Sequence, residues 1–538
     1  MTTSSPNRRA VAGNLAVGLL LALLAAGLLY LQPPHDGSWI SSPGRPRTLA
    51  AAAAVAAWLA LCIGIAWKHR TPRTAETAGT PWLIGWASQT GFARQLAEAS
   101  AEALRAAGQP VRCLPLERID LARLANARRA LFITSTTGEG DAPDHALAFL
   151  HGPMAASAPL GNLHYAVLAL GDRDYARFCA FGRRLDAWLA ERGAVPLFAR
   201  IDVDNADADA IGHWQKHLQG LGARAGSARW ETPFSPWRLS ARTELNPGAC
   251  NGAVHVLSLR PAEGTLPDWQ AGDIAEIRPC NAAAAVDRWL ADAGFDGTAP
   301  VDDAGTVTLR ERLRHSRLPD SAAWHGRPLA QLLPALVPLP QREYSIASIP
   351  ASGTLDLLVR AVAAPDGTPG LGSGWLCRHL PPGGETALRI RSNPGFHPPA
   401  SELPMILIGN GTGLAGLRAH LQARAAAGAK RNWLLFGERH AASDLYFGDE
   451  IRAWQADGTL QRLDLAFSRD PGDGRYVQDA LREAGDALQQ WIDDGAVLYV
   501  CGSLQGMAPG VDAVLDNVLG PGRREALLLA GRYRRDVY

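Results

Sequence analysis

The chain has 538 residues, 47% of them hydrophobic and 20% charged, so it is long enough to bury several hydrophobic cores. The 53 basic and 52 acidic residues nearly cancel, and no nucleic-acid-binding motif occurs, so a nucleic-acid partner is not expected. The seven cysteines are scattered, odd in number and form no CxxC pair, which favours reduced thiols over a disulfide framework or a metal site.

Residues 1–80 differ in composition from the rest of the chain. Residues 10–31 and 49–67 are uncharged, Leu/Ala-rich runs, each long enough to cross a bilayer, and a turn-forming segment separates them. They predict a transmembrane helical hairpin followed by a linker. A signal peptide for the first run and a buried Ala-rich helix for the second are the alternatives.

The charges that flank the two runs predict the topology. Basic residues precede the first run and follow the second, whereas the short loop carries two arginines offset by one aspartate. The positive-inside rule therefore places both ends in the cytoplasm. The predicted location is the cell inner membrane, multi-pass, with the lipid bilayer as a partner and the catalytic domains in the cytoplasm.

From residue 81 onward, short buried strands alternate with helices, and three polar loops each follow a predicted strand. The loops are residues 88–94, 135–141 and 171–178. The first is a hydroxyl-rich turn at a helix N-terminus, which presents Ser88, Thr90 and backbone N–H groups to an anion, although an ordinary helix cap is the alternative. Because the carboxyl ends of parallel strands meet at one edge of an open sheet, the loops are expected to converge on one ligand.

With these loops, residues 81–225 resemble the flavodoxin-like FMN domain of the diflavin reductases. The resemblance implies that the FMN phosphate is held by Ser88, Gln89, Thr90 and Ala93. It implies a ring pocket made by Thr136, Gly138, Gly140, Gly171 and Asp172, with Tyr175 stacked on the isoalloxazine. Phe92 and Thr137 depart from the family pattern, so one ring face is expected to be less covered. The acidic run near these loops is either a solvated rim or a docking face for a basic electron acceptor.

Residues 226–400 contain short strands broken by Gly and Pro, which is typical of a β-barrel, and a helical insert at about residues 281–339. The sequence Arg342-Glu-Tyr-Ser345 and the glycine-rich turn at residues 370–376 resemble the FAD half of ferredoxin-reductase-type enzymes. The resemblance implies that Arg342 binds the FAD phosphates, that Tyr344 packs on the flavin and ribityl, and that Ser345 lies near flavin N5. Gly372 and Ser373 would cap the pyrophosphate.

Residues 401–538 read as a Rossmann-like domain, in which the buried strand at residues 405–409 runs into a Gly-rich turn. Later segments resemble the NADPH domain of the same family in order and spacing. The resemblance implies pyrophosphate binding by Gly411, Thr412, Gly413 and Arg439. It implies binding of the 2′-phosphate and adenine ribose by Ser468, Arg469, Tyr476 and Gln478. Since arginine forms a charge-assisted fork with phosphate, NADPH is favoured over NADH. Gly474 replaces the usual lysine, for which Arg475 is expected to substitute.

The chain ends on an aromatic residue, Tyr538, directly after an acid–valine pair. Taken alone, Tyr538 is a hydrophobic plug for the final strand, and Cys501 is a structural cysteine at the end of a buried strand. The ending also resembles that of diflavin reductases, in which a C-terminal aromatic covers the flavin. That resemblance implies a catalytic group of Ser345, Cys501, Asp536 and Tyr538 around the nicotinamide and flavin N5, where hydride transfer requires close, oriented carbons.

Together the motifs predict a multidomain α/β protein with a β-barrel: a transmembrane hairpin, a flavodoxin-like domain, an FAD barrel with a short insert and a Rossmann-like NADPH domain. The predicted function is a membrane-anchored, NADPH–haemoprotein reductase-like enzyme that passes electrons from NADPH through FAD and FMN to a haem- or iron-containing acceptor protein. Alternatives are the flavoprotein component of assimilatory sulfite reductase and a ferric-siderophore or ferric-chelate reductase. A non-catalytic flavin-binding redox module belongs to another class, and the joint presence of all the motifs argues against it.

Overall fold

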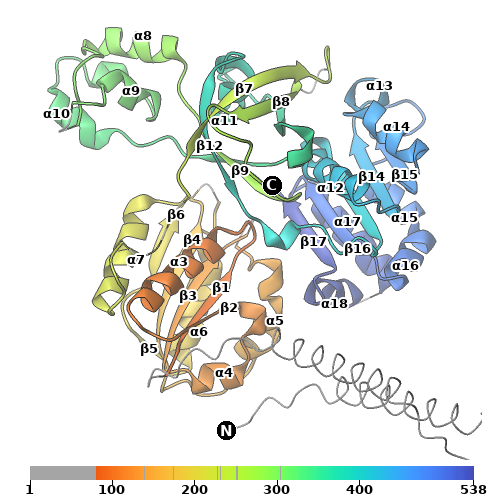
Figure 1. The fold of residues 1–538 in the computed structure, drawn as a ribbon, viewed down its shortest axis with the longest axis horizontal. Helices are drawn as coiled ribbons and strands as arrows, with labels where there is room; N and C mark the ends of the chain where they lie inside the picture. The colour runs from red at the N-terminus through yellow and green to blue at the C-terminus, as the bar shows by residue number, and fades with distance from the viewer. Residues whose placement is uncertain are drawn as a thin grey trace, which may run out of the picture. The chain divides into compact units, whose positions relative to one another are not determined.

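The computed structural model describes residues 80–538, apart from residues 138, 139, 174, 227, 229, 231, 250, 251, 303, 304 and 521. Residues 77–538 form one compact unit. Three β-sheets organise this unit, and they follow one another along the chain (Figure 1). Each sheet carries one group of the motifs described above.

The first sheet is parallel, with the order β2-β1-β3-β4-β5, and β6 also pairs with β4. Its strands are β1 Trp82–Ala87, β2 Val111–Pro115, β3 Arg129–Ser135, β4 His164–Gly171, β5 Val195–Pro196 and β6 Ile201–Asp204. Its helices are α3 Phe92–Ala106, α4 Leu121–Asn126, α5 Leu147–His151, α6 Ala180–Glu191 and α7 Ala208–Gly220. The order 2-1-3-4-5 is that of flavodoxin-like sheets, which bind their ligand where the strand order reverses, between β1 and β3.

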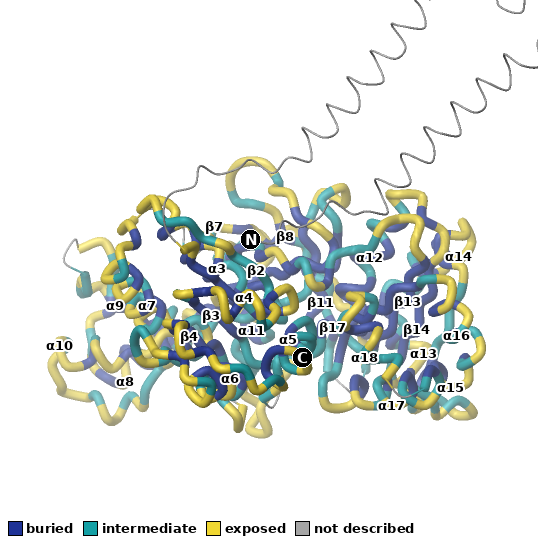
Figure 2. Tube along the Cα trace, turned by 90° about the horizontal axis from the view of Figure 1, so that it is seen from below, coloured by how far each residue is buried: buried dark blue, intermediate teal, exposed yellow. Residues whose placement is uncertain are grey.

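Both faces of this sheet are buried because helices cover each of them. Along β1, Leu83 packs in the cluster of α5 and α6, whereas its neighbours Trp82 and Ile84 pack in the cluster of α3 and α7. Successive side chains of a strand point to opposite faces, so an unbroken apolar strand satisfies both layers. Figure 2 shows buried residues along the central strands and exposed residues toward the outside.

The second sheet is antiparallel, with the order β10-β9-β12-β7-β8-β11. Its strands are β7 Ser235–Glu244, β8 Val254–Pro261, β9 Ile274–Arg278, β10 Arg342–Ser345, β11 Leu355–Arg360 and β12 Glu385–Arg391. A bridge between Ile346 and Leu357 joins the two edge strands, so the sheet closes on itself as a barrel does. Helices α8 Ala283–Ala293, α9 Leu309–Arg314 and α10 Leu329–Leu332 lie between β9 and β10 and share an apolar cluster of their own. Helix α11 Leu371–Gly374 precedes β12.

The third sheet is parallel, with the order β15-β14-β13-β16-β17, which is the Rossmann order 3-2-1-4-5. Its strands are β13 Met405–Asn410, β14 Asn432–Glu438, β15 Arg462–Phe467, β16 Val497–Gly502 and β17 Tyr533–Val537. Helices α12 Leu414–Ala426 and α14 Gly448–Ala456 pack on one face. Helices α15 Val477–Glu483, α16 Gly485–Asp493, α17 Ala508–Leu519 and α18 Arg523–Leu529 pack on the other, and α13 Ala441–Asp444 follows β14.

The predicted inner-membrane location requires correction. Residues 10–31 and 49–67, the predicted hairpin, lie outside the described residues. Among the residues that the structure does describe, no helix has both the length and the apolar composition needed to cross a bilayer. The predicted membrane location is withdrawn, because nothing in the described part of the chain supports it, and no membrane role enters the account that follows.

Two glycines lie in helices that pack on the first sheet, and we expect them to respond oppositely to substitution by alanine. A Cβ at Gly182 in α6 would overlap Ala169 of β4, whereas a Cβ at Gly212 in α7 would meet no atom within 4 Å. We expect Gly182→Ala to lower the free energy of unfolding by about 1–3 kcal/mol, as overpacking does. Gly212→Ala should be neutral or stabilising by up to about 1 kcal/mol, because alanine favours the helix. Urea unfolding of the full chain measures both, and equal effects would contradict the packing of α6 on β4.

Candidate functional site

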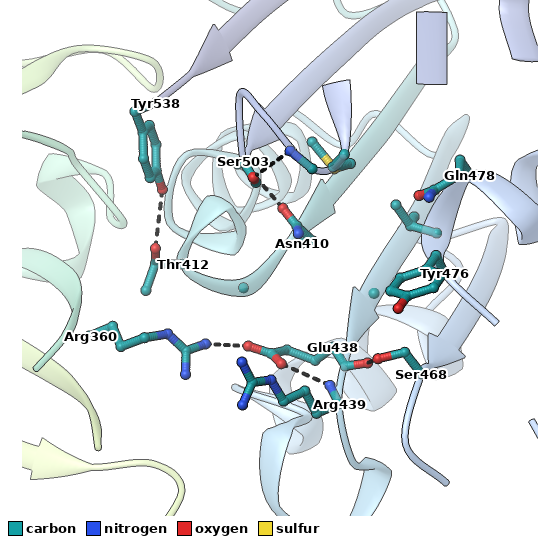
Figure 3. Close-up of a pocket in the computed structure, with 16 residues that line it drawn as sticks. Arg360, Asn410, Thr412, Glu438, Arg439, Ser468, Tyr476, Gln478, Ser503 and Tyr538 are labelled. Carbon is teal, nitrogen blue, oxygen red and sulfur yellow. Dashed lines mark hydrogen bonds and ion pairs between the residues drawn. The ribbon is translucent and has the colours of Figure 1, made fainter. Parts of the chain in front are cut away.

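A cavity of about 590 Å³ lies at the carboxyl ends of β13, β14 and β16 (Figure 3). This is where the order of the third sheet reverses, the usual place for a ligand in such sheets. Seven of its sixteen lining residues were predicted from the sequence: Gly411, Thr412, Arg439, Ser468, Tyr476, Gln478 and Tyr538. The fold therefore gathers motifs from four separate segments around one space.

Glycine is required in the turn that follows β13, for two different reasons. Gly411 has a φ of +57°, in the left-handed region that favours glycine. Gly413 has an ordinary backbone conformation, but a Cβ there would overlap the carbonyl group of Cys501 in β16. Gly413 does not line the cavity. A glycine at this position instead allows the turn to approach β16.

Four polar residues of the cavity were not predicted: Arg360, Asn410, Glu438 and Ser503. Asn410 Oδ1 accepts a hydrogen bond from the Ser503 N–H at 3.0 Å, which ties the turn after β13 to the turn after β16. Glu438, at the end of β14, forms an ion pair with Arg360. Arg360 ends β11 of the barrel, outside every nucleotide motif, so only the packing of two sheets brings it to the cavity.

The arginines near the adenine end differ in their surroundings. Arg469 is exposed and, like Arg475, does not line the cavity, and its backbone N–H donates to the Arg439 carbonyl at 2.9 Å. The Arg475 guanidinium lies 2.5 Å from carboxylate oxygens of both Asp473 and Glu483, and it does not line the cavity. The expectation that Arg475 replaces the missing lysine is therefore not supported, because two carboxylates already hold its side chain.

Ser345, Cys501 and Asp536 come together from β10, β16 and β17. Ser345 Oγ donates to Asp536 Oδ2 at 2.7 Å, and Cys501 Sγ donates to the same oxygen at 3.8 Å. Asp536 is only 9% exposed. Burial raises the pKa of the Asp536 carboxyl, and burial beside Asp536 raises the pKa of the Cys501 thiol well above its usual value. Cys501 thus remains a neutral hydrogen-bond donor, which suits positioning better than nucleophilic attack.

The backbone of Tyr538 is fixed while its ring is left open. Its N–H donates to the Gly502 carbonyl, and its own carbonyl accepts from the Leu504 N–H, both at 3.0 Å. The side-chain hydroxyl lies 3.3 Å from Thr412 Oγ1, yet the residue is 55% exposed. Burial raises the pKa of the Tyr538 phenol well above its usual value, so the hydroxyl end is enclosed while much of the residue is exposed, and the interpretation of Tyr538 as a plug for the final strand stays an alternative.

The predicted FAD residues adjoin one another at the end of the barrel. A Cβ at Gly372 would overlap the Tyr344 hydroxyl and would lie 2.8 Å from Arg342 Cγ, so the glycine-rich turn is close to β10. Ser373 Oγ, in the same turn, accepts a hydrogen bond from the Val362 N–H at 3.1 Å. The structure thus places the turn and the strand motif side by side, as one ligand contacting both would require.

The three polar loops of the first sheet also converge. The Gln89 N–H donates to Ser135 Oγ at 3.3 Å, and the Thr136 N–H donates to the Leu170 carbonyl at 3.0 Å. Within the first loop, Ser88 Oγ accepts from the Ala93 N–H. Of the other predicted ring-pocket residues, Gly140 follows β3, Gly171 ends β4, and Asp172 and Tyr175 follow β4, while Gly138 lies outside the described residues.

Three exposed tyrosines test whether these residues fit planar cofactors. Tyr175, Tyr476 and Tyr538 are 38%, 56% and 55% exposed, although aromatic side chains are usually well buried. All three stand at positions predicted to contact a flavin or the adenine end of a nucleotide. An open aromatic face next to a polar loop suits stacking with such a ring, so the residues present fit the predicted cofactors.

Comparisons with known proteins agree with this geometry. The flavodoxin family model matches residues 84–214, and the oxidoreductase NAD-binding domain model matches residues 407–513. The sulfite reductase [NADPH] flavoprotein alpha-component of Yersinia enterocolitica is 33% identical over 549 aligned residues, which cover 87% of this chain and 91% of that protein. The corresponding protein of Salmonella paratyphi B is 32% identical, with 89% and 95% covered. At this identity and coverage, the chain belongs to the diflavin reductase family.

Proposed function

We propose that this protein is the flavoprotein component of a sulfite reductase-type system, and that it delivers electrons to a haem- or iron-containing partner. Membership of its family makes the chain an NADPH-dependent flavoprotein oxidoreductase with FAD, FMN and NADPH as cofactors. The relatives are named as alpha-components of sulfite reductase, which supports the sulfite reductase alternative over a membrane haemoprotein reductase. When bound, the two flavins convert a hydride from NADPH into single electrons.

One observation carries the proposal: the nucleotide cavity and the Ser345–Asp536–Cys501 group are joined by the terminal strand. Tyr538 lines the cavity, and Asp536, two residues earlier, accepts hydrogen bonds from Ser345 and Cys501. The nicotinamide end of a nucleotide in this cavity would therefore reach the group that borders the FAD motifs. Such placement is what hydride transfer requires of a protein, because its rate depends on the distance and orientation of the reacting carbons.

The acidic run of the flavodoxin-like sheet gives less support to a basic acceptor than its sequence suggests. The run consists of Glu139, Asp141, Asp144, Asp172, Asp174, Asp202 and Asp204. Of these, Asp144, Asp202 and Asp204 form ion pairs with arginines of this chain. Charges already neutralised in this way contribute little to the long-range field that would steer a basic partner. We therefore propose that the acceptor is recognised through shape and local contacts more than through a general acidic face.

Purification of the full chain from its native cells tests the proposed partner. We expect a protein with a haem absorption spectrum to copurify, and the pair to form sulfide from sulfite and NADPH, whereas the chain alone should form none. Copurification with a ferric-chelate-binding protein and no sulfide formation would instead support the ferric reductase alternative.

A pair of arginine substitutions tests the nucleotide preference. We expect Arg469→Ala to weaken NADPH binding by roughly 2–3 kcal/mol while leaving NADH binding nearly unchanged, because charge-assisted hydrogen bonds to phosphate have this magnitude. Arg475→Ala is the matched control, since Asp473 and Glu483 hold that side chain, and it should affect both nucleotides little. Nucleotide titrations measure the four dissociation constants. If Arg469→Ala weakens the binding of both nucleotides equally, the role of Arg469 is structural.

The terminal tyrosine should control access to the flavin. We expect Tyr538→Ala to leave the melting temperature nearly unchanged, because the ring is exposed, and to improve NADH use more than NADPH use. A nicotinamide that no longer displaces a stacked ring gains about 0.5–1.5 kcal/mol, and NADH, which lacks the 2′-phosphate, depends on that gain more. Stopped-flow measurement of flavin reduction with each nucleotide checks this. A lowered melting temperature with unchanged nucleotide preference is the opposing result.

A further inference from the structure

Arg391, the last residue of β12 in the barrel, contacts the first polar loop of the flavodoxin-like sheet. Its guanidinium Nη1 donates to Thr90 Oγ1 at 2.8 Å and also to the Thr90 carbonyl. Arg391 is 4% exposed, so this contact is shielded from water. A residue of the barrel therefore contacts the loop of the flavodoxin-like sheet that is proposed to hold the FMN phosphate.

The one cation of that loop is its last residue, Arg94. Residues 88–93 include neither lysine nor arginine. The next residue, Arg94, forms an ion pair with Glu98 at 2.7 Å, and its guanidinium lies over the Trp86 ring. A phosphate monoester carries a charge of about −1.5 to −2 at neutral pH. Backbone N–H groups at the start of α3 supply only about half a unit of positive charge, so a further cation would stabilise the bound phosphate.

The hydrogen bond from Arg391 also sets the direction of the Thr90 hydroxyl. A threonine hydroxyl has one proton to donate and lone pairs with which to accept. Because Thr90 Oγ1 accepts a hydrogen bond from Arg391, its own proton is available for another acceptor. A phosphate oxygen in the loop is such an acceptor, so Arg391 prepares Thr90 as a donor.

Two acids of the barrel hold Arg391 in this orientation. Its Nε lies 2.7 Å from Glu276, and its Nη2 lies 2.6 Å from Glu343, which leaves Nη1 directed at Thr90. Arg389 forms an ion pair with the same Glu276, so the cluster contains two arginines and two glutamates and is close to neutral. Arg389, Glu276 and Arg391 are almost fully buried, whereas Glu343 is partly exposed, and breaking a pair among the three buried members would leave an uncompensated charge.

The backbone of the loop is equally close to the barrel. Gly91 has a φ of +90°, and a Cβ there would overlap the carbonyl of Ser392, the residue after Arg391. Glycine is therefore required at this position both by conformation and by the close approach. The proximity of Arg391 to the loop thus depends on main-chain packing as well as on one flexible side chain.

We propose that Arg391 completes the FMN phosphate site from the FAD barrel, as a positioning residue that fixes the Thr90 hydroxyl as a donor. The inference rests on the proposed binding of FMN at residues 88–93. It makes FMN affinity a property of two sheets, so the flavodoxin-like part binds its cofactor most tightly when the barrel lies against it.

The test compares FMN with riboflavin, which lacks the phosphate, on full-length protein from which FMN has been removed. We expect Arg391→Met to weaken FMN binding roughly tenfold to a hundredfold, the range for a hydrogen bond to a charged group, and to leave riboflavin binding unchanged. Arg391→Lys should restore part of the loss. In a double-mutant cycle, Arg391→Met should have a smaller effect on FMN binding when Thr90 is already valine. Fluorescence titration measures each dissociation constant.

Two control substitutions remove a nearby arginine without touching Thr90. Arg389→Met disturbs the same buried cluster, and Arg94→Gln removes the arginine nearest to the loop in sequence. Both should leave the ratio of FMN to riboflavin affinity unchanged. If Arg391→Met weakens both ligands alike, or if Arg389→Met changes the ratio as much, Arg391 is only structural and the inference is wrong. If Arg391→Met does not fold, the ratio of FMN to riboflavin affinity is measured for Arg391→Lys and Thr90→Val instead. Equal weakening of both ligands in these variants would likewise make the inference wrong. Failure of the unmodified protein to bind FMN would instead overturn the proposed function.

Discussion

The pairing of the terminal strand β17 with β16 is the constraint on which the proposed site depends. This register sets Asp536 beside Cys501 and Val537 beside Gly502. Because side chains alternate along a strand, Asp536 points to the face where Ser345 and Cys501 meet it, and Arg535 points to the other. A slip of one residue would exchange the two faces and put Arg535 or Val537, depending on its direction, in the place of the carboxylate. One strand register thus decides whether the group beside the nicotinamide forms.

The same strand connects the third sheet to the first. Arg535 Nε donates to Asp144 Oδ2 at 2.9 Å, and the Arg535 carbonyl accepts from the Gln89 side chain at 3.0 Å. Two further polar contacts link the other sheets: Arg360 of the barrel pairs with Glu438 of the third sheet, and Arg391 of the barrel bonds to Thr90 of the first. In each case an arginine of a strand reaches a polar residue of another sheet's layer, and Arg360 and Arg391 are the last residues of their strands. Charged contacts of this kind fix orientation more than they add stability, which suits parts that must align two flavins.

The sequence predicts the parallel sheets well because their signals are local. Buried apolar runs followed by glycine or hydroxyl-rich turns mark β1, β3, β4, β13 and β16, and their carboxyl ends must meet by topology. The resemblance of the segments after these strands, and of the C-terminus, to the diflavin reductases pointed to seven lining residues of the nucleotide cavity. Arg360 and Arg391 could not be predicted, since each lies at the end of a barrel strand and reaches its site only through packing between sheets. The ion pairs of Arg475 with Asp473 and Glu483 could not be predicted for a related reason, because the sequence does not say which way its side chain turns.

Anaerobic titration of the purified full-length protein with NADPH, combined with release and quantification of its flavins, tests the central claim most directly. The account predicts FMN and FAD in near-equal amounts and bleaching of both flavin absorptions by NADPH. FAD alone would contradict the assignment of the three loops of the first sheet to FMN, and flavins that NADPH does not bleach would contradict the joining of the nucleotide cavity to the Ser345–Asp536–Cys501 group.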